Sequence, residues 1–537
     1  MSHIDVPRRR RAIVGATAAI TAVATIAALG LLTAVTSSPS GATTSAETVV
    51  APDGSVILGP SATASPASLS PATGSLADVK NVVFILADDL DWELFNEIPR
   101  LAALQDQGMT FTHHVVTDSL CCPSRTSILR SQYIHNHLVV SNTSATGGGW
   151  PTFKARGEDN DCLPVWLQNA GVTTALFGKF MNDYPATTAT TIREVPPGWT
   201  KWAVPVSRGE SYTGYDYVLN SDGQLERHGS KPTDFLNDVI TNRAVDFIST
   251  APDGFFLELS TYNPHKPSPV ATRNKDTHAD TVAPRTASYN VAGTNAPTWM
   301  RKLKPLSSWK QWQLDQLWRQ RAQSAESVAD SVEAVMTELR ATGHDDDTLV
   351  VLTSDNGYHA GAHGLANGKR TAFHEDTVVP MVIMGPGVSP GARVDALTST
   401  VDLGPTFTEL LGAQAPDWVD GRSLVPILQT SVAPQGWRTA ALSESMGLST
   451  PVDPDYQAEA PPSFSAMRTQ QYLFVVYRDG ERELYDLAAD PNEMNNIAST
   501  ADPILVTNLN SQLQAMRSCS GASCRTADSM VISTGAP

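Results

Sequence analysis

Short apolar runs alternate with amphipathic stretches along most of the chain after residue 80. A continuous apolar run of this length is typical of a strand that is buried on both faces, whereas apolar residues at helical spacing indicate a helix. The runs lie at 81–87, 172–177, 255–259 and 348–353, and helices are predicted at 98–108, 163–171, 238–249 and 308–342. The alternation predicts an α/β fold, with a mainly parallel central sheet sandwiched by helices.

The pattern changes after Gly412. Residues 464–468, 471–477 and 483–487 have strand-like composition and are separated by turn signals, which predicts an antiparallel sheet. We therefore expect a catalytic domain at 79–415 and a smaller α+β domain at 416–537. Two stretches without a regular pattern, 195–233 and 267–299, are predicted to be long insertions of the kind that often bind substrate.

The N-terminus carries four consecutive arginines, Arg8 to Arg11, before an uncharged run that ends near Val35. A basic region followed by an apolar stretch is typical of an export signal, and this run is also long enough to anchor the chain in a bilayer. We expect residues 1–36 to be a signal peptide or signal anchor. Residues 37–78 are rich in Ser, Thr, Ala and Pro and are predicted to be a linker. The protein is thus expected to be exported, and either secreted or tethered at the cell surface.

The charge balance restricts the range of partners. The chain has 537 residues, 41% of them hydrophobic, and a net charge of −17. Such an acidic protein is not expected to bind nucleic acid or a broad anionic membrane surface. If its substrate is an anion, the site must create its own local positive charge.

Polar side chains follow the predicted strands. Because ligands of parallel α/β sheets bind outside the carboxyl ends of the strands, we expect these side chains to converge. Carboxylate and amide oxygens favour Ca²⁺, with Mg²⁺ as second choice. His359 and His363 are four residues apart, but the glycines around them argue against the helix that a zinc pair would need. The strand-end residues are Asp88, Asp89, Lys179, His265, Asp355 and Asn356.

A pair of cysteines opens another predicted helix, in the stretch Cys121-Cys122-Pro123-Ser124-Arg125. Proline suits the first turn of a helix, so Cys121 is expected at the N–H-rich end, where anions bind. Taken alone, the pair is better explained as a buried or disulfide-bonded structural feature. Together with Lys179, Lys369 and a divalent cation, however, Arg125 would form a positive pocket for sulfate or phosphate. His265 could protonate the leaving oxygen.

The other cysteines add a second argument for reactive chemistry. Cys519 and Cys524 are close enough in sequence to close a small disulfide loop. This leaves an odd number among Cys121, Cys122 and Cys162, which in an exported protein indicates a reactive thiol. Cys122 is expected to be packed or paired with Cys162.

From about Asn81 to the C-terminal hairpin, the ordered set of motifs resembles the sulfatase family of the alkaline-phosphatase-like superfamily. The stretch Cys-Cys-Pro-Ser-Arg matches the family signature Cys-x-Pro-Ser-Arg. The resemblance implies that a formylglycine-generating enzyme oxidises Cys121, not Cys122, to formylglycine (3-oxoalanine). In that family a hydroxyl of the hydrated aldehyde attacks sulfur, and the sulfate ester is hydrolysed.

The resemblance also implies roles for the other residues. Ala87-Asp88-Asp89-Leu90 and Ser354-Asp355-Asn356-Gly357 resemble the metal-binding motifs, so Asp88, Asp89, Asp355 and Asn356 would hold Ca²⁺ together with the modified Cys121. Arg125 and Lys179 would position the hydrated formylglycine. Lys369 and His265 would hold the sulfate, and either could act as the acid for the leaving alcohol.

The segment around Lys179 indicates a branch of the family. Many arylsulfatases read Gly-Lys-x-His there, whereas this chain has Met181 at the histidine position. Gly-Lys-Phe-Met-Asn and the stretch from Tyr133 to His137 look more like the N-acetylglucosamine-6-sulfatase branch. The implied substrate is a sulfated sugar, such as 6-sulfated glucosamine, or an aryl sulfate. His135 and His137 would either line the substrate pocket or pack inside the domain.

Two alternative functions fit the same sequence. The fold could instead hydrolyse phosphonate or phosphate esters, because the transition states at sulfur and phosphorus are similar. The long linker and the anchor-like N-terminus would also suit a surface glycan-binding protein in which Cys121 stays unconverted. The intact metal, lysine and histidine positions argue against such an inactive binder.

Overall fold

The computed structural model describes residues 74–532, apart from 186–190, 207–208, 448–449, 452, 454 and 458–459. The predicted signal or anchor at 1–36 and nearly all of the predicted linker at 37–78 lie outside the described residues. Within the described part of the chain, no helix is both long and apolar enough to cross a membrane.

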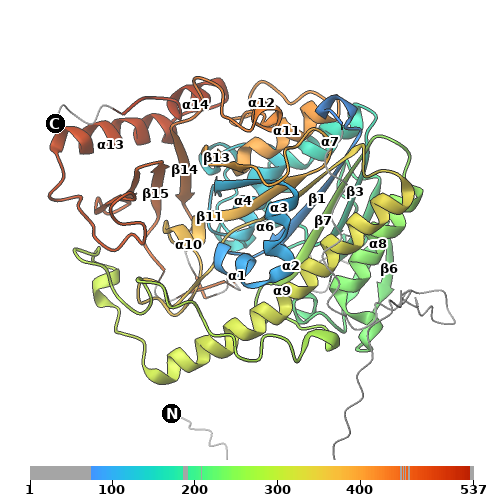
Figure 1. The fold of residues 1–537 in the computed structure, drawn as a ribbon, viewed down its shortest axis with the longest axis horizontal. Coiled ribbons are helices and arrows are strands. Elements are labelled where there is room, and N and C mark those ends of the chain that lie inside the picture. Colours follow the sequence, from blue (N-terminus) through green and yellow to red (C-terminus); the bar gives the residue numbers. More distant parts are fainter. Residues whose placement is uncertain are drawn as a thin grey trace, which may run out of the picture. The chain divides into compact units, whose positions relative to one another are not determined.

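A large sheet forms the centre of the catalytic region (Figure 1). Among the described residues it has eleven strands, in the order β12-β2-β11-β8-β1-β7-β3-β4-β5-β6, with β13 paired to β2. Its central strands are parallel: β8 (Thr348–Ser354), β1 (Asn81–Asp88), β7 (Phe255–Pro264), β3 (Thr173–Gly178) and β4 (Lys201–Pro205). The predicted α/β class with a mainly parallel sheet is thereby confirmed.

The two edges of the sheet are mixed. At one edge, β11 (Val378–Met384) runs antiparallel to β8 and to β2 (Met109–Val115). The short strands β12 (Arg393–Val394) and β13 (Thr398–Ser399) pair in parallel with β2. At the other edge, β5 (Val218–Ser221) and β6 (Gln224–Arg227) continue antiparallel from β4.

Helices cover both faces of this sheet, and the burial of β1 shows this. Every residue of β1 is buried, and alternate residues enter different hydrophobic clusters: Val83 and Ile85 on one face, Val82 and Phe84 on the other. The first cluster includes side chains of α1 (Trp92–Glu97), α2 (Pro99–Ala102), α3 (Leu104–Gln107), α8 (Leu236–Thr250) and α9 (Ser308–Thr342). The second includes side chains of α4 (Cys121–Arg130), α6 (Gly149–Ala155), α7 (Leu163–Asn169), α11 (Leu403–Leu410) and α12 (Val425–Thr430).

Helix α9 matches its predicted span. The hydroxyl of Ser307 accepts from the amide of Lys310 at the N-terminus, and Gly343 ends the helix with φ 74°. The helix predicted at 98–108 is interrupted instead. Its two pieces, α2 and α3, meet at Ala103, whose carbonyl accepts from Asp106 in a tighter turn than an α-helix makes.

The prediction that residues 195–233 form a long insertion without regular structure is wrong. This stretch contains β4, β5 and β6, which extend the main sheet instead of forming one irregular loop. These strands are only four or five residues long and are partly exposed, so they carry little of the apolar pattern that marks the central strands. The stretch 267–299 is irregular, as predicted, with one 3₁₀ turn at Thr272–Asn274.

A four-stranded antiparallel sheet forms the C-terminal part. It comprises β14 (Ala440–Ser445), which was not predicted, and β15 (Phe464–Thr469), β16 (Tyr472–Tyr477) and β17 (Arg482–Asp486), which were. Residues of α13 (Pro503–Arg517) and α14 (Ala522–Ala527) pack into one hydrophobic cluster with this sheet. The remaining short elements are α5 (Ile134–His137), β9 (His359–Ala360), β10 (Asn367–Gly368) and α10 (His374–Thr377).

The five cysteines divide into one disulfide and three free thiols, and one of the expected alternatives is not found. Cys519 and Cys524 form the predicted disulfide. Cys121, Cys122 and Cys162 are free and buried. The alternative of a Cys122–Cys162 bond is therefore wrong, because both thiols pack as apolar groups in the same hydrophobic cluster.

Candidate active site

The carboxyl ends of neighbouring strands bring the predicted acidic residues together. β1 ends in Asp88, followed by Asp89 at φ 65°, and β8 is followed by Asp355 and Asn356. Because β1 and β8 are paired in parallel, the two ends meet. The amide of Asp89 lies 3.3 Å from Asp355 Oδ1, and Asn356 Nδ2 lies 2.6 Å from Asp89 Oδ1.

Cys121 lies beside this cluster, at the first residue of α4. Lys369 Nζ is 2.8 Å from its Sγ, and the thiol donates to Asp88 Oδ1 at 3.4 Å. The side chain is fully buried, and burial raises its pKa well above the ordinary value. An unmodified Cys121 would therefore be a neutral thiol and a poor nucleophile.

Buried cations surround Cys121 and the carboxylates. Lys179 follows β3 and pairs with Asp88, while Lys369 Nζ is 2.6 Å from Asp89 Oδ1. Burial opposes the charged form of each amine, but Asp88 keeps the pKa of Lys179 well above its ordinary value, and Asp455 and Asp89 do so for Lys369. Both lysines are consequently charged at neutral pH.

Arg125 connects three strand ends from its position on α4. Its Nε donates to Asp355 Oδ2 at 2.7 Å, and its Nη1 donates to Ser260 Oγ at 2.6 Å and to the carbonyl of Lys179 at 3.0 Å. Its Nη2 is buried without a hydrogen-bond partner among the described residues. The guanidinium thus fixes Asp355 and leaves one donor for another group.

The acidic cluster has the donors that a hard divalent cation needs. Asp89 Oδ2 and Asn356 Oδ1 are buried and have no hydrogen-bond partner in the described part of the chain. Burying unpaired oxygens is costly, and a bound cation would remove that cost. Donor atoms of Asp88, Asp89, Cys121 and His265 lie within 4.8 Å of one another. The oxygen donors of Asp88, Asp89, Asp355 and Asn356 fit Ca²⁺ or Mg²⁺ better than Zn²⁺, which would prefer His and Cys ligands.

His265 completes the group from the loop after β7. Its Nε2 lies 3.1 Å from Asp455 Oδ1, its Nδ1 lies 2.5 Å from the carbonyl oxygen of Lys266, and its ring packs against Tyr212. Burial alone would lower its pKa, but Asp88, Asp89 and Asp455 outweigh burial and raise it. The structure thus brings all nine predicted side chains together: Asp88, Asp89, Cys121, Arg125, Lys179, His265, Asp355, Asn356 and Lys369.

Three residues in contact with the site were not foreseen. Ser260 lies in the middle of β7 but directly follows the apolar run predicted at 255–259, so the strand-end rule could have found it. Asn142 accepts from the amide of Cys122 at 3.0 Å and donates to Asp455 Oδ2 at 2.9 Å. Asn142 and Asp455 lie between regular elements, where the hydrophobic pattern carries no signal.

His359 and His363 do not form a metal pair. His359 Nδ1 lies 2.9 Å from Asp376 Oδ1, whereas His363 stacks on Phe373 and faces Glu375. The two rings therefore have different carboxylate partners.

The histidines of α5 also have structural partners. His135 Nδ1 lies 2.7 Å from Glu444 Oε2, and its Nε2 lies 3.0 Å from the carbonyl oxygen of Cys519. His137 is fully buried, 3.0 Å from Ser127 Oγ. Of the two roles considered for them, these contacts favour packing.

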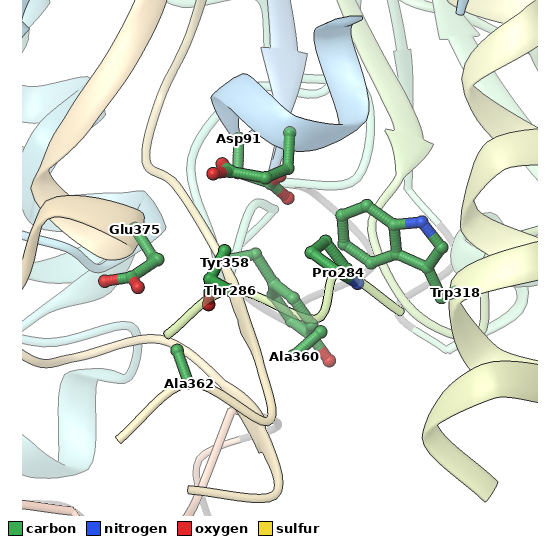
Figure 2. A pocket seen from close by; sticks show the side chains of 9 residues that line it. Asp91, Pro284, Thr286, Trp318, Tyr358, Ala360, Ala362 and Glu375 are labelled. Atoms are coloured by element: carbon green, nitrogen blue, oxygen red, sulfur yellow. The ribbon is translucent and has the colours of Figure 1, made fainter. Parts of the chain in front are cut away.

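A small cleft lies next to the acidic cluster (Figure 2). Arg321 separates the two, since it donates to the carbonyl of Asp89 and to Asp91 Oδ2 and stacks on Tyr358. The cleft is lined by three carboxyl groups, those of Asp91, Glu93 and Glu375. Such a lining would repel an anion, so the positive groups around Cys121 are the better place for one. Its lining residues are Asp91, Glu93, Pro284, Thr286, Trp318, Tyr358, Ala360, Ala362 and Glu375.

Buried lysines and an arginine around a hard-oxygen cluster, at the strand ends of an α/β sheet, define a class of hydrolase that acts on anionic esters. The profile of the Sulfatase family matches residues 80–413. A profile described as the C-terminal part of N-sulphoglucosamine sulphohydrolase matches residues 361–519. The chain belongs to the sulfatase family and is a sulfuric ester hydrolase.

Curated relatives agree over most of the chain. It is 34% identical to the N-acetylglucosamine-6-sulfatase of Homo sapiens, over 83% of this chain and 86% of that protein. It is 30% identical to the arylsulfatase of Volvox carteri, over 83% of this chain and 75% of that one.

Solved structures share the fold. A structure described in complex with its substrate D-glucosamine-2-N,6-O-disulfate superposes with a TM-score of 0.66 at 22% identity, covering 82% of this chain and 96% of the other. The phosphonate monoester hydrolase of Agrobacterium radiobacter superposes with a TM-score of 0.62 at 20% identity, covering 82% and 95%. At these identities the likeness shows the fold alone.

Proposed function

We propose that this sulfatase removes the 6-O-sulfate of a glucosamine-type sugar, using a formylglycine made from Cys121 and a bound Ca²⁺. The observation that carries the proposal is the position of Cys121, whose Sγ touches both Lys369 and Asp88 at the start of α4. A residue oxidised there would lie between the acidic cluster and the cations. The sugar is supported by the relative named N-acetylglucosamine-6-sulfatase at 34% identity.

Formylglycine and Ca²⁺ would supply only part of the chemistry. Formylglycine, when formed by a formylglycine-generating enzyme, supplies the nucleophilic oxygen, and Ca²⁺ supplies positive charge for the developing oxyanions. Asp88, Asp89, Asp355, Asn356 and the modified residue 121 would hold the cation. Arg125 fixes Asp355 at 2.7 Å, so the cation ligands are already oriented.

The remaining residues bind the ester and move a proton. Lys179 and Lys369 are charged and buried, so they can hold sulfate and stabilise the charge that develops on its oxygens. His265 Nε2 faces the cluster, so an N–H there can be donated to the leaving alcohol.

Replacing the two adjacent cysteines tests the proposal. Cys121→Ala should abolish hydrolysis of 4-nitrophenyl sulfate and of N-acetylglucosamine 6-sulfate, because it removes the precursor of the nucleophile. Cys122→Ala is the matched control, since Cys122 is buried in a hydrophobic cluster and should affect stability rather than chemistry. Full sulfatase activity in the Cys121→Ala protein would contradict the proposal.

The same assay separates the alternatives. If the protein were a phosphonate or phosphate ester hydrolase, matched aryl phosphonate or phosphate esters would be cleaved faster than the aryl sulfate. If it were an inactive glycan-binding protein, it would bind the sulfated sugar without turnover.

Removing divalent cations should inactivate the enzyme and lower its melting temperature, because Asp89 Oδ2 and Asn356 Oδ1 then stay buried and unpaired. After chelation, we expect Ca²⁺ to restore both properties more completely than Mg²⁺. Ca²⁺ accepts carboxylate and amide oxygens in a flexible geometry, whereas Mg²⁺ demands a near-ideal octahedron. Activity that survives exhaustive chelation would exclude a catalytic cation.

We also propose that residues 1–36 direct export and that residues 37–78 form a linker. The Cys519–Cys524 disulfide supports an oxidising compartment. One relative, from Drosophila melanogaster, is named an extracellular sulfatase homolog. The N-terminal sequence of the protein recovered outside the cell would show whether the first segment is cleaved or kept as an anchor.

A further inference from the structure

A carboxylate from the C-terminal part lies inside the cluster around Cys121. Asp455 Oδ1 is 3.1 Å from His265 Nε2, and Asp455 Oδ2 is 3.3 Å from Lys369 Nζ. Asn142 Nδ2 donates to the same Oδ2 at 2.9 Å, and Cys121 Sγ lies 3.8 Å from it. Lys266 Nζ is 3.7 Å from Oδ1. The side chain of Asp455 is only 3% exposed.

These contacts use the groups that a sulfate would need. Both ring nitrogens of His265 are engaged, Nε2 by Asp455 and Nδ1 by the carbonyl of Lys266. His265 can therefore donate a proton to a leaving oxygen only after Asp455 has released Nε2. Lys369 likewise divides its charge between Asp89 and Asp455.

Asp455 is held in this position by its neighbours. Its amide donates to Asp453 Oδ1 at 2.9 Å, and Asp453 Oδ2 accepts from Arg370 Nη1 at 3.1 Å. Arg370 directly follows Lys369 in the sequence. The same short stretch therefore supplies a cation for each of the two aspartates.

We propose that the Asp455 carboxylate is an intramolecular competitor of sulfate, occupying the sulfate subsite in the free enzyme and withdrawing when a sulfated substrate binds. A carboxylate and a sulfate group are both anions with oxygen acceptors, and these are the features that Lys369, His265 and Asn142 recognise. His265 Nε2 carries a single proton, so it cannot donate to Asp455 and to a sulfate oxygen at the same time. The inference rests on the proposed function, because it takes Lys369 and His265 as the sulfate-binding groups.

The competitor has a defined thermodynamic effect. The apparent dissociation constant of a ligand equals its intrinsic value divided by the fraction of protein in the competent state. While Asp455 holds Lys369 and His265, that fraction is small. Removal of the carboxylate should tighten sulfate binding, and it should also destabilise the sulfate-free protein, because the buried cations lose a partner.

The experiment measures inorganic sulfate binding to Ca²⁺-loaded Cys121→Ala protein by titration calorimetry. In this background there is no turnover. Adding Asp455→Ala should tighten sulfate binding about tenfold or more, and sulfate should raise the melting temperature of the double variant more than that of Cys121→Ala alone. Asp455→Asn, which keeps the size of the side chain, should tighten binding in the same direction and serves if the alanine variant does not fold.

Asp346→Ala is the matched control for net charge. Asp346 is exposed and lies just before β8, at the opposite end of that strand from the site. It should leave sulfate binding unchanged.

The outcomes distinguish this inference from the proposed function. Tighter binding in the Asp455 variants alone supports the competitor. Unchanged or weaker binding in the Asp455 variants, in a protein whose unmutated form hydrolyses sulfate esters, overturns the competitor and leaves the proposed function intact. If the unmutated protein does not hydrolyse sulfate esters and no variant binds sulfate, both are overturned.

Discussion

Arg125 illustrates how one side chain can organise a site. It lies one turn after Cys121 on α4, so it faces the same strand ends as the cysteine. Its contacts reach β8 through Asp355, β7 through Ser260 and β3 through the carbonyl of Lys179. A planar guanidinium can make these contacts at once, whereas the amine of a lysine is a single point charge.

Arg125→Lys should therefore be damaging although it keeps the charge. We expect kcat/KM for 4-nitrophenyl sulfate to fall about 100-fold, comparable to loss of one oriented donor in other active sites. The affinity for Ca²⁺ should fall as well, because Asp355 loses its partner. Arg130→Lys, at the opposite end of the same helix from Cys121, is the control and should keep the activity of the parent enzyme. Equal activity of the two variants would show that Arg125 acts only through its charge.

At the scale of elements, the C-terminal sheet buries an acid. Glu483 on β17 is fully buried and accepts from Tyr477 Oη at 3.0 Å and Tyr485 Oη at 3.2 Å. Burial raises its pKa to about 7, from an ordinary 4.5. Between these values the folded state holds the proton and the unfolded state does not. The free energy of unfolding therefore falls as pH rises from 4.5 to 7.

Glu483→Gln should remove this pH-dependent fall in the free energy of unfolding. We expect the variant to be more stable than the parent at pH 8, by about 1 to 3 kcal/mol, and the difference to shrink towards pH 5. Thermal unfolding at both pH values measures it. Glu409→Gln, at an exposed position of α11, is the control. A variant that is destabilised equally at both pH values would show that Glu483 is needed as a hydrogen-bond acceptor only.

The sequence predicted the elements that are buried throughout and missed those that are partly exposed. β1 and β8 are buried at every residue, so their apolar runs are continuous and conspicuous. No residue of β6 is buried, and the pairing of β6 with β5 is set by the tertiary structure rather than by local composition. The helix predicted at 98–108 had the right extent, but its interruption at Ala103 has no signal in the apolar spacing.

At the scale of the whole described unit, strand-end residues alone do not complete the site. The strand-end rule and the cysteine motif pointed to eight of the nine side chains that meet around Cys121, and Lys369 was proposed separately as a further cation of the positive pocket. Asp455 comes instead from the connection between β14 and β15, which lies in the predicted C-terminal domain of residues 416–537. The contact of Asp455 with His265 joins residues 190 positions apart. Only the fold shows such a pairing, because neither residue's local sequence specifies the other.

Charge is also organised at this scale. The chain carries a net charge of −17, yet Arg125, Lys179 and Lys369 are buried within one cluster. Each of these cations is paired with a carboxylate at short range, which stabilises the charged form in the protein interior. Binding of an anionic ester therefore depends on local pairing rather than on the overall charge.

The mass of the tryptic peptide that contains residue 121, from protein produced in its native host, shows whether Cys121 is the precursor of the nucleophile. Active enzyme should carry an aldehyde in place of the Cys121 thiol, the peptide should react with a hydrazide probe, and Cys122 in the same peptide should stay a thiol. A fully active enzyme whose Cys121 is an intact, unmodified thiol would contradict it.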